Sequence, residues 1–179
     1  MIFRRPNPLI WSVAALLALA AFIATYVLFV RGESGQEFDN QMLVAAEDVV
    51  PAGGTRAGAL AFLSNLPLVS AGIAVIALIA ALAVRRLFES PVVALVTALA
   101  AAATTQILKA VLTRPDLGIS QATMNSFPSG HTTLAAAAMF AAVLVTSPRW
   151  RPVVATLGGL FAATAAASTY VLGWHRPSD

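Results

Sequence analysis

Long apolar segments constrain this chain more than any other feature, because a helix needs about 20 mostly apolar residues to cross a bilayer. Hydrophobic residues make up 59% of its 179 residues, more than soluble domains contain. We therefore predict an all-α integral membrane protein, with a single transmembrane domain over residues 1–179 that forms a bundle of five helices. The predicted helices cover residues 9–30, 66–84, 91–112, 132–147 and 152–172, and the fourth is the shortest.

The first apolar segment is longer than the core of a secretory signal peptide, so a retained helix is the favoured interpretation despite the basic start at Arg4 and Arg5. If the N-terminus is cytoplasmic, the later arginine pairs fall at inner turns, as the positive-inside rule requires. The net charge of +3 then reflects topology, and no basic stripe with aromatic residues indicates a nucleic-acid partner. We expect a multi-pass protein of the cell membrane, partnered by the lipid bilayer, in an oligomeric state that the sequence leaves open. The later inner arginines are Arg85, Arg86, Arg149 and Arg151.

An acidic stretch follows the first helix on the predicted outer side. Apolar residues recur in it at near-helical spacing from Phe38 to Val50, which predicts an amphipathic helix lying at the interface over about residues 38–50. A plain surface loop is the alternative. Nothing in this stretch indicates chemistry.

The segment Asn125–His131 is polar and turn-forming and directly precedes a long apolar run. Ser129 or Gly130 is expected at the N-cap of the fourth helix, where backbone N–H groups lack partners and the helix dipole is positive. Such a helix start binds anions, and phosphate is a natural occupant. A plain cap beside an interfacial histidine is the alternative.

The third helix becomes polar in its last third. Thr105 and Lys109 share a helical face, and Arg114 and Pro115 end the helix. A lysine at this depth commonly extends to the headgroups. Here the predicted topology brings both cations to the same outer rim as the Ser129 cap, so we expect them to contribute to an anion site.

Both histidines of the chain are predicted at the outer ends of helices, His131 at the start of the fourth and His175 at the end of the fifth. Ser168, Leu172 and His175 share one face if the helix continues past Gly173. Two imidazoles and a carboxylate can bind zinc, but the neighbouring cations repel a metal ion, so a tetrahedral anion is the favoured ligand. We therefore expect no metal and no cofactor.

Asp179 lies four residues after His175, within reach of one ring nitrogen. There a carboxylate fixes the tautomer and stabilises the charged form of the imidazole. The other ring nitrogen can then attack phosphorus, and His131 can protonate the departing oxygen. The pattern indicates phosphoryl transfer to a histidine.

Three elements of the chain together resemble the signature of the type 2 phosphatidic acid phosphatase superfamily, the membrane lipid phosphate phosphatases related to vanadium haloperoxidases. They are Lys109 with Arg114-Pro115, then Pro128-Ser129-Gly130-His131, then Ser168 with His175 and Asp179. The resemblance implies a metal-independent phosphatase or pyrophosphatase that acts on a lipid or isoprenoid phosphate through a phosphohistidine, at the extracytoplasmic face. It implies that His175 is the nucleophile, Asp179 its orienting partner and His131 the acid. Lys109, Arg114, Ser129 and Gly130 would hold the phosphate.

The sequence departs from the family pattern at three places. Lys109 and Arg114 are separated by four residues where the family usually has six, so Asp116 stands at the expected arginine position. Thr169 stands where the third element has an arginine. The family fold has six membrane helices with the aspartate at the start of the last, so we expect a C-terminally truncated form of that fold, ending at Asp179. A catalytically impaired relative that binds lipid phosphates, or a membrane partner subunit, is the alternative function.

Overall fold

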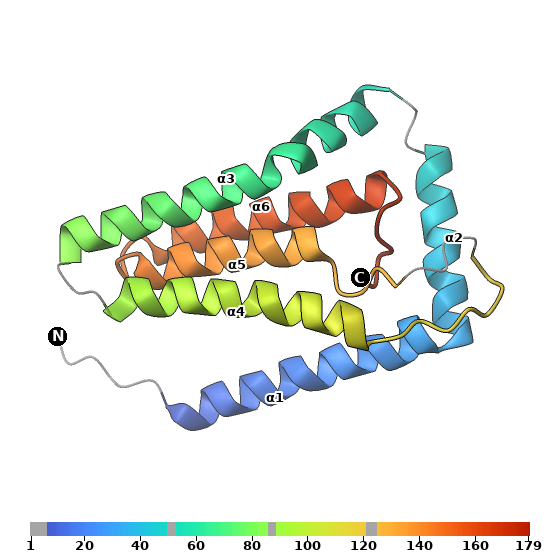
Figure 1. The fold of residues 1–179 in the computed structure, drawn as a ribbon, viewed down its shortest axis with the longest axis horizontal. Coiled ribbons are helices and arrows are strands. Elements are labelled where there is room, and N and C mark those ends of the chain that lie inside the picture. The colour runs from blue at the N-terminus through green and yellow to red at the C-terminus, as the bar shows by residue number, and fades with distance from the viewer. Residues whose placement is uncertain (1–6, 50–52, 86–88, 121–124) are drawn as a thin grey trace.

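The computed structural model describes residues 7–49, 53–85, 89–120 and 125–179. Helices α3, α4, α5 and α6 form a bundle, α1 lies beside it, and α2 crosses the end at which the chain terminates (Figure 1). The described part of the chain contains no strand, so the predicted all-α fold is confirmed. The elements are α1 (Pro8–Thr25), continued by the π-helical segment η1 (Tyr26–Arg31), α2 (Glu33–Val49), α3 (Gly54–Arg85), α4 (Glu89–Val111), α5 (Gly130–Val145) and α6 (Arg151–Val171).

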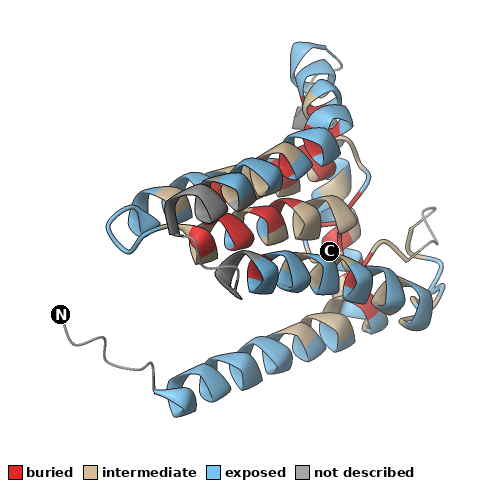
Figure 2. Cartoon of the chain, turned by 60° about the vertical axis from the view of Figure 1, so that its left-hand side comes forward, coloured by how far each residue is buried: buried red, intermediate tan, exposed pale blue. Residues whose placement is uncertain are grey.

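In the described part of the chain, 4 helices are long and apolar enough to span a membrane. Their large apolar side chains face outward, and α1 is exposed along almost its whole length (Figure 2). Exposure of such an apolar surface to water is unfavourable, whereas in a bilayer the same surface contacts the apolar lipid chains. The chain is therefore a multi-pass membrane protein. The spans are Pro8–Arg31, Gly54–Ala77, Val92–Val111 and Arg151–Val171.

The short helix α5 lies between its neighbours and packs against α3, α4 and α6. Its 16 residues make it about 24 Å long, which is less than the ~30 Å hydrocarbon core of a bilayer. The helix does not have to reach the membrane surface, because Ser129 at its start is buried within the protein. Its buried face consists of small residues, which let the neighbouring helices approach closely. These residues are Ala135, Ala138, Ala141, Ala142 and Val145.

Helix α3 begins at Gly54, earlier than the predicted start at residue 66, and continues through Pro67. Ser64 and Asn65 interrupt the apolar pattern in the sequence, yet both are compatible with a helix. Their side chains donate to the carbonyl of Ala61 at 3.0 and 2.8 Å, so they satisfy their hydrogen-bonding capacity within the helix itself. Helix α3 therefore extends beyond both ends of the predicted segment 66–84.

Helix α2 occupies the acidic stretch and begins at Glu33, before the predicted start at residue 38. Residue 50, the predicted end of this segment, lies outside the described residues, as do Arg4, Arg5 and Arg86 of the predicted inner side. The exposed Arg149 precedes α6, at the end of the bundle opposite the chain terminus (Figure 1). The orientation in the membrane stays a prediction.

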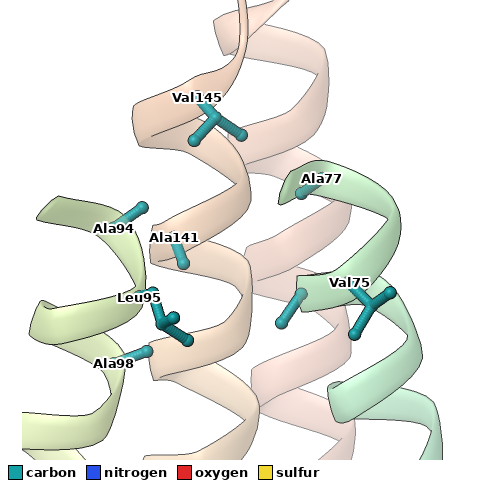
Figure 3. Close-up of a pocket in the computed structure, with 8 residues that line it drawn as sticks. Val75, Ala77, Ala94, Leu95, Ala98, Ala141 and Val145 are labelled. Carbon is teal, nitrogen blue, oxygen red and sulfur yellow. The ribbon is translucent and has the colours of Figure 1, made fainter. Parts of the chain in front are cut away.

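A small apolar cavity of about 60 Å³ lies between α3, α4 and α5 (Figure 3). Short alanine side chains from the three helices leave this space, and valine and leucine complete its wall. No predicted site residue lines it, so the cavity is a feature of helix packing. The residues labelled around it are Val75, Ala77, Ala94, Leu95, Ala98, Ala141 and Val145.

Close packing of α5 against α6 depends on Gly158. A Cβ atom placed on Gly158 would lie 2.8 Å from the Cβ of Met139, closer than carbon atoms pack. The next residue, Gly159, has open space at the same position. The two glycines therefore form a matched pair, one inside the helix contact and one outside it.

We predict that Gly158→Leu lowers the free energy of unfolding by about 1–3 kcal/mol, because it overpacks the contact with Met139. Gly159→Leu makes the same chemical change toward open space and should not lower stability, because leucine favours a helix more than glycine does. Melting of the purified proteins in detergent measures both. Equal melting temperatures for the two variants would contradict the described contact.

Candidate active site

Ser129 is the N-cap of α5, as the sequence predicted. Its hydroxyl oxygen accepts hydrogen bonds from the backbone N–H of Thr132 at 3.4 Å and from the Thr132 hydroxyl at 3.0 Å. Gly130 is the first helical residue, so the N–H groups of the first turn point out of the helix end. The helix start therefore has the form of an anion site.

The ammonium group of Lys109, in the last turn of α4, lies beside this helix start. A Cβ atom placed on Gly130 would lie 3.9 Å from Lys109 Nζ and 3.7 Å from Gln106 Nε2. The positive end of the helix dipole repels the lysine ammonium group. An anion bound between them would neutralise both positive charges. Glycine leaves the backbone open to such an anion, so this arrangement suits phosphate.

His175 is carried by a tight turn after α6. The helix ends at Val171, and Gly173 has a φ of +71°, a left-handed conformation that commonly ends helices. The backbone N–H groups of Trp174 and His175 both donate to the carbonyl of Thr169, at 3.0 and 3.3 Å. The sequence placed Ser168, Leu172 and His175 on one helical face only if the helix continued past Gly173. The helix ends before Gly173, so His175 does not share a helical face with Ser168.

The predicted pair of His175 and Asp179 is present, with Nδ1 of the imidazole 3.2 Å from Oδ2 of the carboxylate. The same oxygen accepts from the Ser126 hydroxyl and, at 2.9 Å, from the backbone N–H of Arg176. Burial alone would raise the pKa of Asp179, but the hydrogen bonds from His175, Ser126 and Arg176 lower it below its ordinary value. An ionised Asp179 thus holds the ring so that Nε2 is turned away from the carboxylate.

One backbone hydrogen bond joins the two halves of the site. The N–H of Ser129 donates to the carbonyl of Asp179 at 2.9 Å. His131 in the first turn of α5 faces Trp174, with ring centroids 5.7 Å apart, and interacts electrostatically with Lys109 and with the other histidine. The predicted site residues brought together here are Lys109, Ser129, Gly130, His131, His175 and Asp179.

Arg114 lies on the side of the site that contains the orienting carboxylate. The charges that act on it are those of Arg176, Asp179 and Asp39. Burial, together with the charge of Arg176, lowers the pKa of Arg114. No described residue provides a hydrogen-bond partner for its buried Nη1 and Nη2 atoms. Contact between Arg114 and phosphate stays a prediction.

The two positions at which the family pattern has arginine contribute differently. Asp116 is exposed, and its side chain accepts from a nearby backbone N–H at 3.0 Å. Thr169 is buried, and its hydroxyl donates to the backbone carbonyl of Ala166 in its own helix at 2.8 Å.

Arg176 donates to Ser126 Oγ at 3.2 Å and to Ser120 Oγ at 3.4 Å, so its guanidinium supports the segment that precedes α5.

Asp39 and Ser178 also belong to this region, although the sequence did not predict either of them as a site residue. Asp39 on α2 is fully buried and accepts a hydrogen bond from the Ser178 hydroxyl. The two residues are 139 positions apart, so no local motif connects them. Ser126 was within the predicted turn, but its partner Asp179 is 53 positions away, so this contact is not part of a local motif either. A single sequence carries no signal for such long-range polar contacts.

The zinc alternative requires both histidines and a carboxylate in one group. Among the described residues, no group of three or more histidine, aspartate or glutamate side chains is arranged to hold a metal ion. His131 faces an indole ring, whereas His175 faces Asp179. An anion therefore stays the favoured ligand.

A cavity of about 400 Å³ opens beside these residues. Polar groups of the site contribute to its wall, together with side chains from α2 and α6. It is large enough to admit a phosphate group with part of an attached chain. Its lining includes Met42, Ser129, Ala167, Tyr170, His175 and Asp179.

These features define a polytopic helical membrane protein with a candidate anion site where α4 ends, α5 begins and the turn after α6 returns. The family model of the PAP2 superfamily matches residues 90–179, half of the chain, which include every predicted site residue. The chain belongs to the PAP2 superfamily, and the resemblance found in the sequence is confirmed. Members of this superfamily are phosphatases, which supports phosphoester hydrolysis in general. No curated protein and no solved structure matches the chain.

We predict a loss of stability at acid pH that depends on Asp179. Because folding lowers its pKa from the ordinary 3.8, the ionised carboxylate stabilises the fold above that value. This contribution is lost as the pH falls through the lower pKa of the folded state. Asp179→Asn should therefore melt at a lower temperature than the parent at neutral pH, and the difference should shrink as the pH falls below 3.8. Melting curves across this range measure it, and a difference independent of pH would contradict the stated cause.

Proposed function

We propose that this protein is a lipid or isoprenoid phosphate or pyrophosphate phosphatase that acts through a phosphohistidine. The observation that carries the proposal is the meeting of Lys109, the start of α5 and the His175–Asp179 pair at one end of the bundle. A cation and a helix N-terminus bind the phosphate, while an oriented imidazole supplies a nucleophile. Membership of the PAP2 superfamily supports the reaction class.

In the first step, Nε2 of His175 attacks phosphorus as the bond between phosphorus and the leaving oxygen breaks. Asp179 accepts the hydrogen bond from Nδ1–H and stabilises the positive charge that develops on the ring. His131 donates a proton to the leaving oxygen, which departs as an alcohol, or as a phosphomonoester when the substrate is a diphosphate. Lys109 and the N–H groups at Gly130 stabilise the charge on the phosphoryl oxygens.

In the second step, water attacks the phosphorus of the phosphohistidine and the nitrogen–phosphorus bond breaks. His131, now deprotonated, accepts a proton from the water. Inorganic phosphate leaves, and both histidines return to their starting states. The lysine and the helix start supply positive charge throughout, so the scheme has no step that requires a metal or cofactor.

The surroundings of the site support a substrate with a hydrocarbon chain. A groove of about 370 Å³ lies between α3 and α6 and is mostly apolar. It shares Ala167 with the cavity that contains His175. A phosphate at His175 and a chain between α3 and α6 can thus belong to one molecule. The groove is lined by Gly54, Thr55, Gly58, Ala59, Phe62, Thr164, Ala167, Ser168 and Val171.

The proposed site is on the extracytoplasmic side of the cell membrane. Arg149 and Arg151 are exposed at the opposite end of the bundle, which supports a cytoplasmic position for that end. A lipid phosphate in the outer leaflet would present its headgroup at the level of α2 and the start of α5. The N-terminus is then cytoplasmic.

A second candidate is a catalytically impaired relative that binds lipid phosphates or serves as a membrane partner subunit. The two positions at which the family pattern has arginine favour this candidate, because neither carries a cation here. Asp116 is exposed and acidic, and Thr169 is buried and uncharged. Loss of one charge-assisted contact weakens transition-state binding by about 1.5–3 kcal/mol, roughly 10–100-fold in rate. The two candidates therefore differ in turnover and share ligand binding.

We predict that the purified protein releases phosphate from a lipid phosphate in the presence of a metal chelator. His175→Ala should lower kcat by about a thousandfold or more, because it removes the nucleophile. Lys109→Gln should lower kcat/KM by roughly 10–100-fold, because one charge-assisted contact with phosphate is lost. Arg149→Gln removes a cation at the other end of the bundle and should change kcat/KM by less than about twofold.

The outcomes of this assay separate the candidates. A His175→Ala variant as active as the parent would refute the phosphohistidine. Activity that chelation abolishes and zinc restores would favour metal catalysis. Lipid phosphate that binds without any release of phosphate would favour the impaired relative.

We also predict that Thr164→Phe discriminates between substrates by chain length, because Thr164 lines the groove between α3 and α6 but not the cavity that contains His175, and the ring fills that groove. For a long-chain lipid phosphate kcat/KM should fall by about tenfold, whereas for a short, water-soluble phosphomonoester it should change by less than about twofold. Ala155→Phe, at an exposed position near the other end of α6, is the control. Equal losses for both substrates would place the hydrocarbon chain elsewhere.

A further inference from the structure

Helix α2 carries two fully or almost fully buried polar side chains although it lies across the end of the bundle. Asp39 is 0% exposed and Gln36 is 3% exposed, whereas Glu37 between them is exposed. Gln36 and Asp39 are three residues apart and therefore share one face of the helix. A buried carboxylate is costly unless it is hydrogen-bonded, so its retention here calls for specific partners.

The partners of this face adjoin the site residues. The side-chain amide of Gln36 donates to the carbonyl of Pro115 at 3.1 Å, directly after Arg114. The carboxylate of Asp39 accepts from the hydroxyl of Ser178, directly before Asp179 in the chain. Two neighbouring side chains of α2 thus hold the segment after α4 and the terminal turn in place.

Further contacts fix α2 itself, so it can act as a rigid support. The amide of Gln36 also donates to the carbonyl of Val30 at 2.8 Å, which ties α2 to the end of η1. The hydroxyl of Tyr170 on α6 donates to the carbonyl of Met42. The charge of Arg114 attracts the Asp39 carboxylate, whereas the charge of Asp179 repels it, so the attachment depends on the hydrogen bonds and on Arg114. The helix is therefore attached to α1, to α6 and to both segments of the site.

From these contacts we infer that Asp39, assisted by Gln36, is a positioning residue: through Ser178 it fixes the turn in which Asp179 orients His175. This inference rests on the proposed function. Asp39 itself contacts no reacting atom in this scheme. Its effect is on the geometry of the His175–Asp179 pair, which matters because catalytic groups must be held within about 0.5 Å of their productive positions.

The role predicts a change in kcat with little change in KM, because Lys109 and the α5 start, which bind the phosphate, are untouched. Asp39→Ala and Ser178→Ala should each lower kcat for a lipid phosphate by about tenfold, with KM altered by less than about twofold. The double variant should be no slower than the slower single variant, because both changes remove one hydrogen bond. Asp39→Asn keeps an acceptor oxygen for Ser178 and should recover most of kcat.

Glu37→Gln, on the exposed face of the same helix, is the matched control and should retain the kcat of the parent. Ser178→Ala keeps the test decisive if Asp39→Ala does not fold, since it removes the same contact from the other side. Unchanged kcat in Ser178→Ala, or an equal loss in Asp39→Asn and Asp39→Ala, overturns the positioning role while leaving the proposed function intact. A parent protein that releases no phosphate overturns both.

Discussion

A single buried carboxylate, that of Asp179, receives hydrogen bonds from the His175 ring, from the hydroxyl of Ser126 and from the backbone N–H of Arg176. Its backbone carbonyl accepts from Ser129 at the start of α5. The segment before α5 and the turn after α6, which are about 50 residues apart in the sequence, therefore meet at this residue. Because a buried charge is costly unless it is hydrogen-bonded, the turn after α6 and the segment before α5 stabilise each other through this carboxylate.

The sequence was sufficient for the fold class because membrane-spanning helices are dictated by length and apolarity alone. It was less informative about element boundaries. Ser64 and Asn65 interrupt the apolar pattern but bond to their own helix, so α3 extends well before its predicted start. Conversely, Gly173 ends α6 before His175 through a left-handed conformation that hydropathy does not register.

Within the site, the residues that could be anticipated lie in short motifs whose chemistry is local. A cap before an apolar helix indicates Ser129 and Gly130, and the four-residue spacing indicates that Asp179 can reach His175. The contribution of α2 could not be anticipated, because it depends on how two ends of the chain meet in space. Asp39 is one acidic residue among several in its stretch, and its burial distinguishes it from the exposed Glu33 and Glu37.

The aromatic neighbour of His131 gives the site a built-in optical probe. Of the three tryptophans in the chain, Trp174 lies in the terminal turn, with its ring 5.7 Å from the imidazole, centroid to centroid. Trp11 belongs to the start of α1 and Trp150 precedes α6, at the end of the bundle away from the terminus (Figure 1). A protonated imidazole quenches indole emission, so a chain that retains only Trp174 would report the charge state of His131 by its fluorescence. Protonation of His131, the acid of the proposed reaction, would then be observable without a labelled substrate.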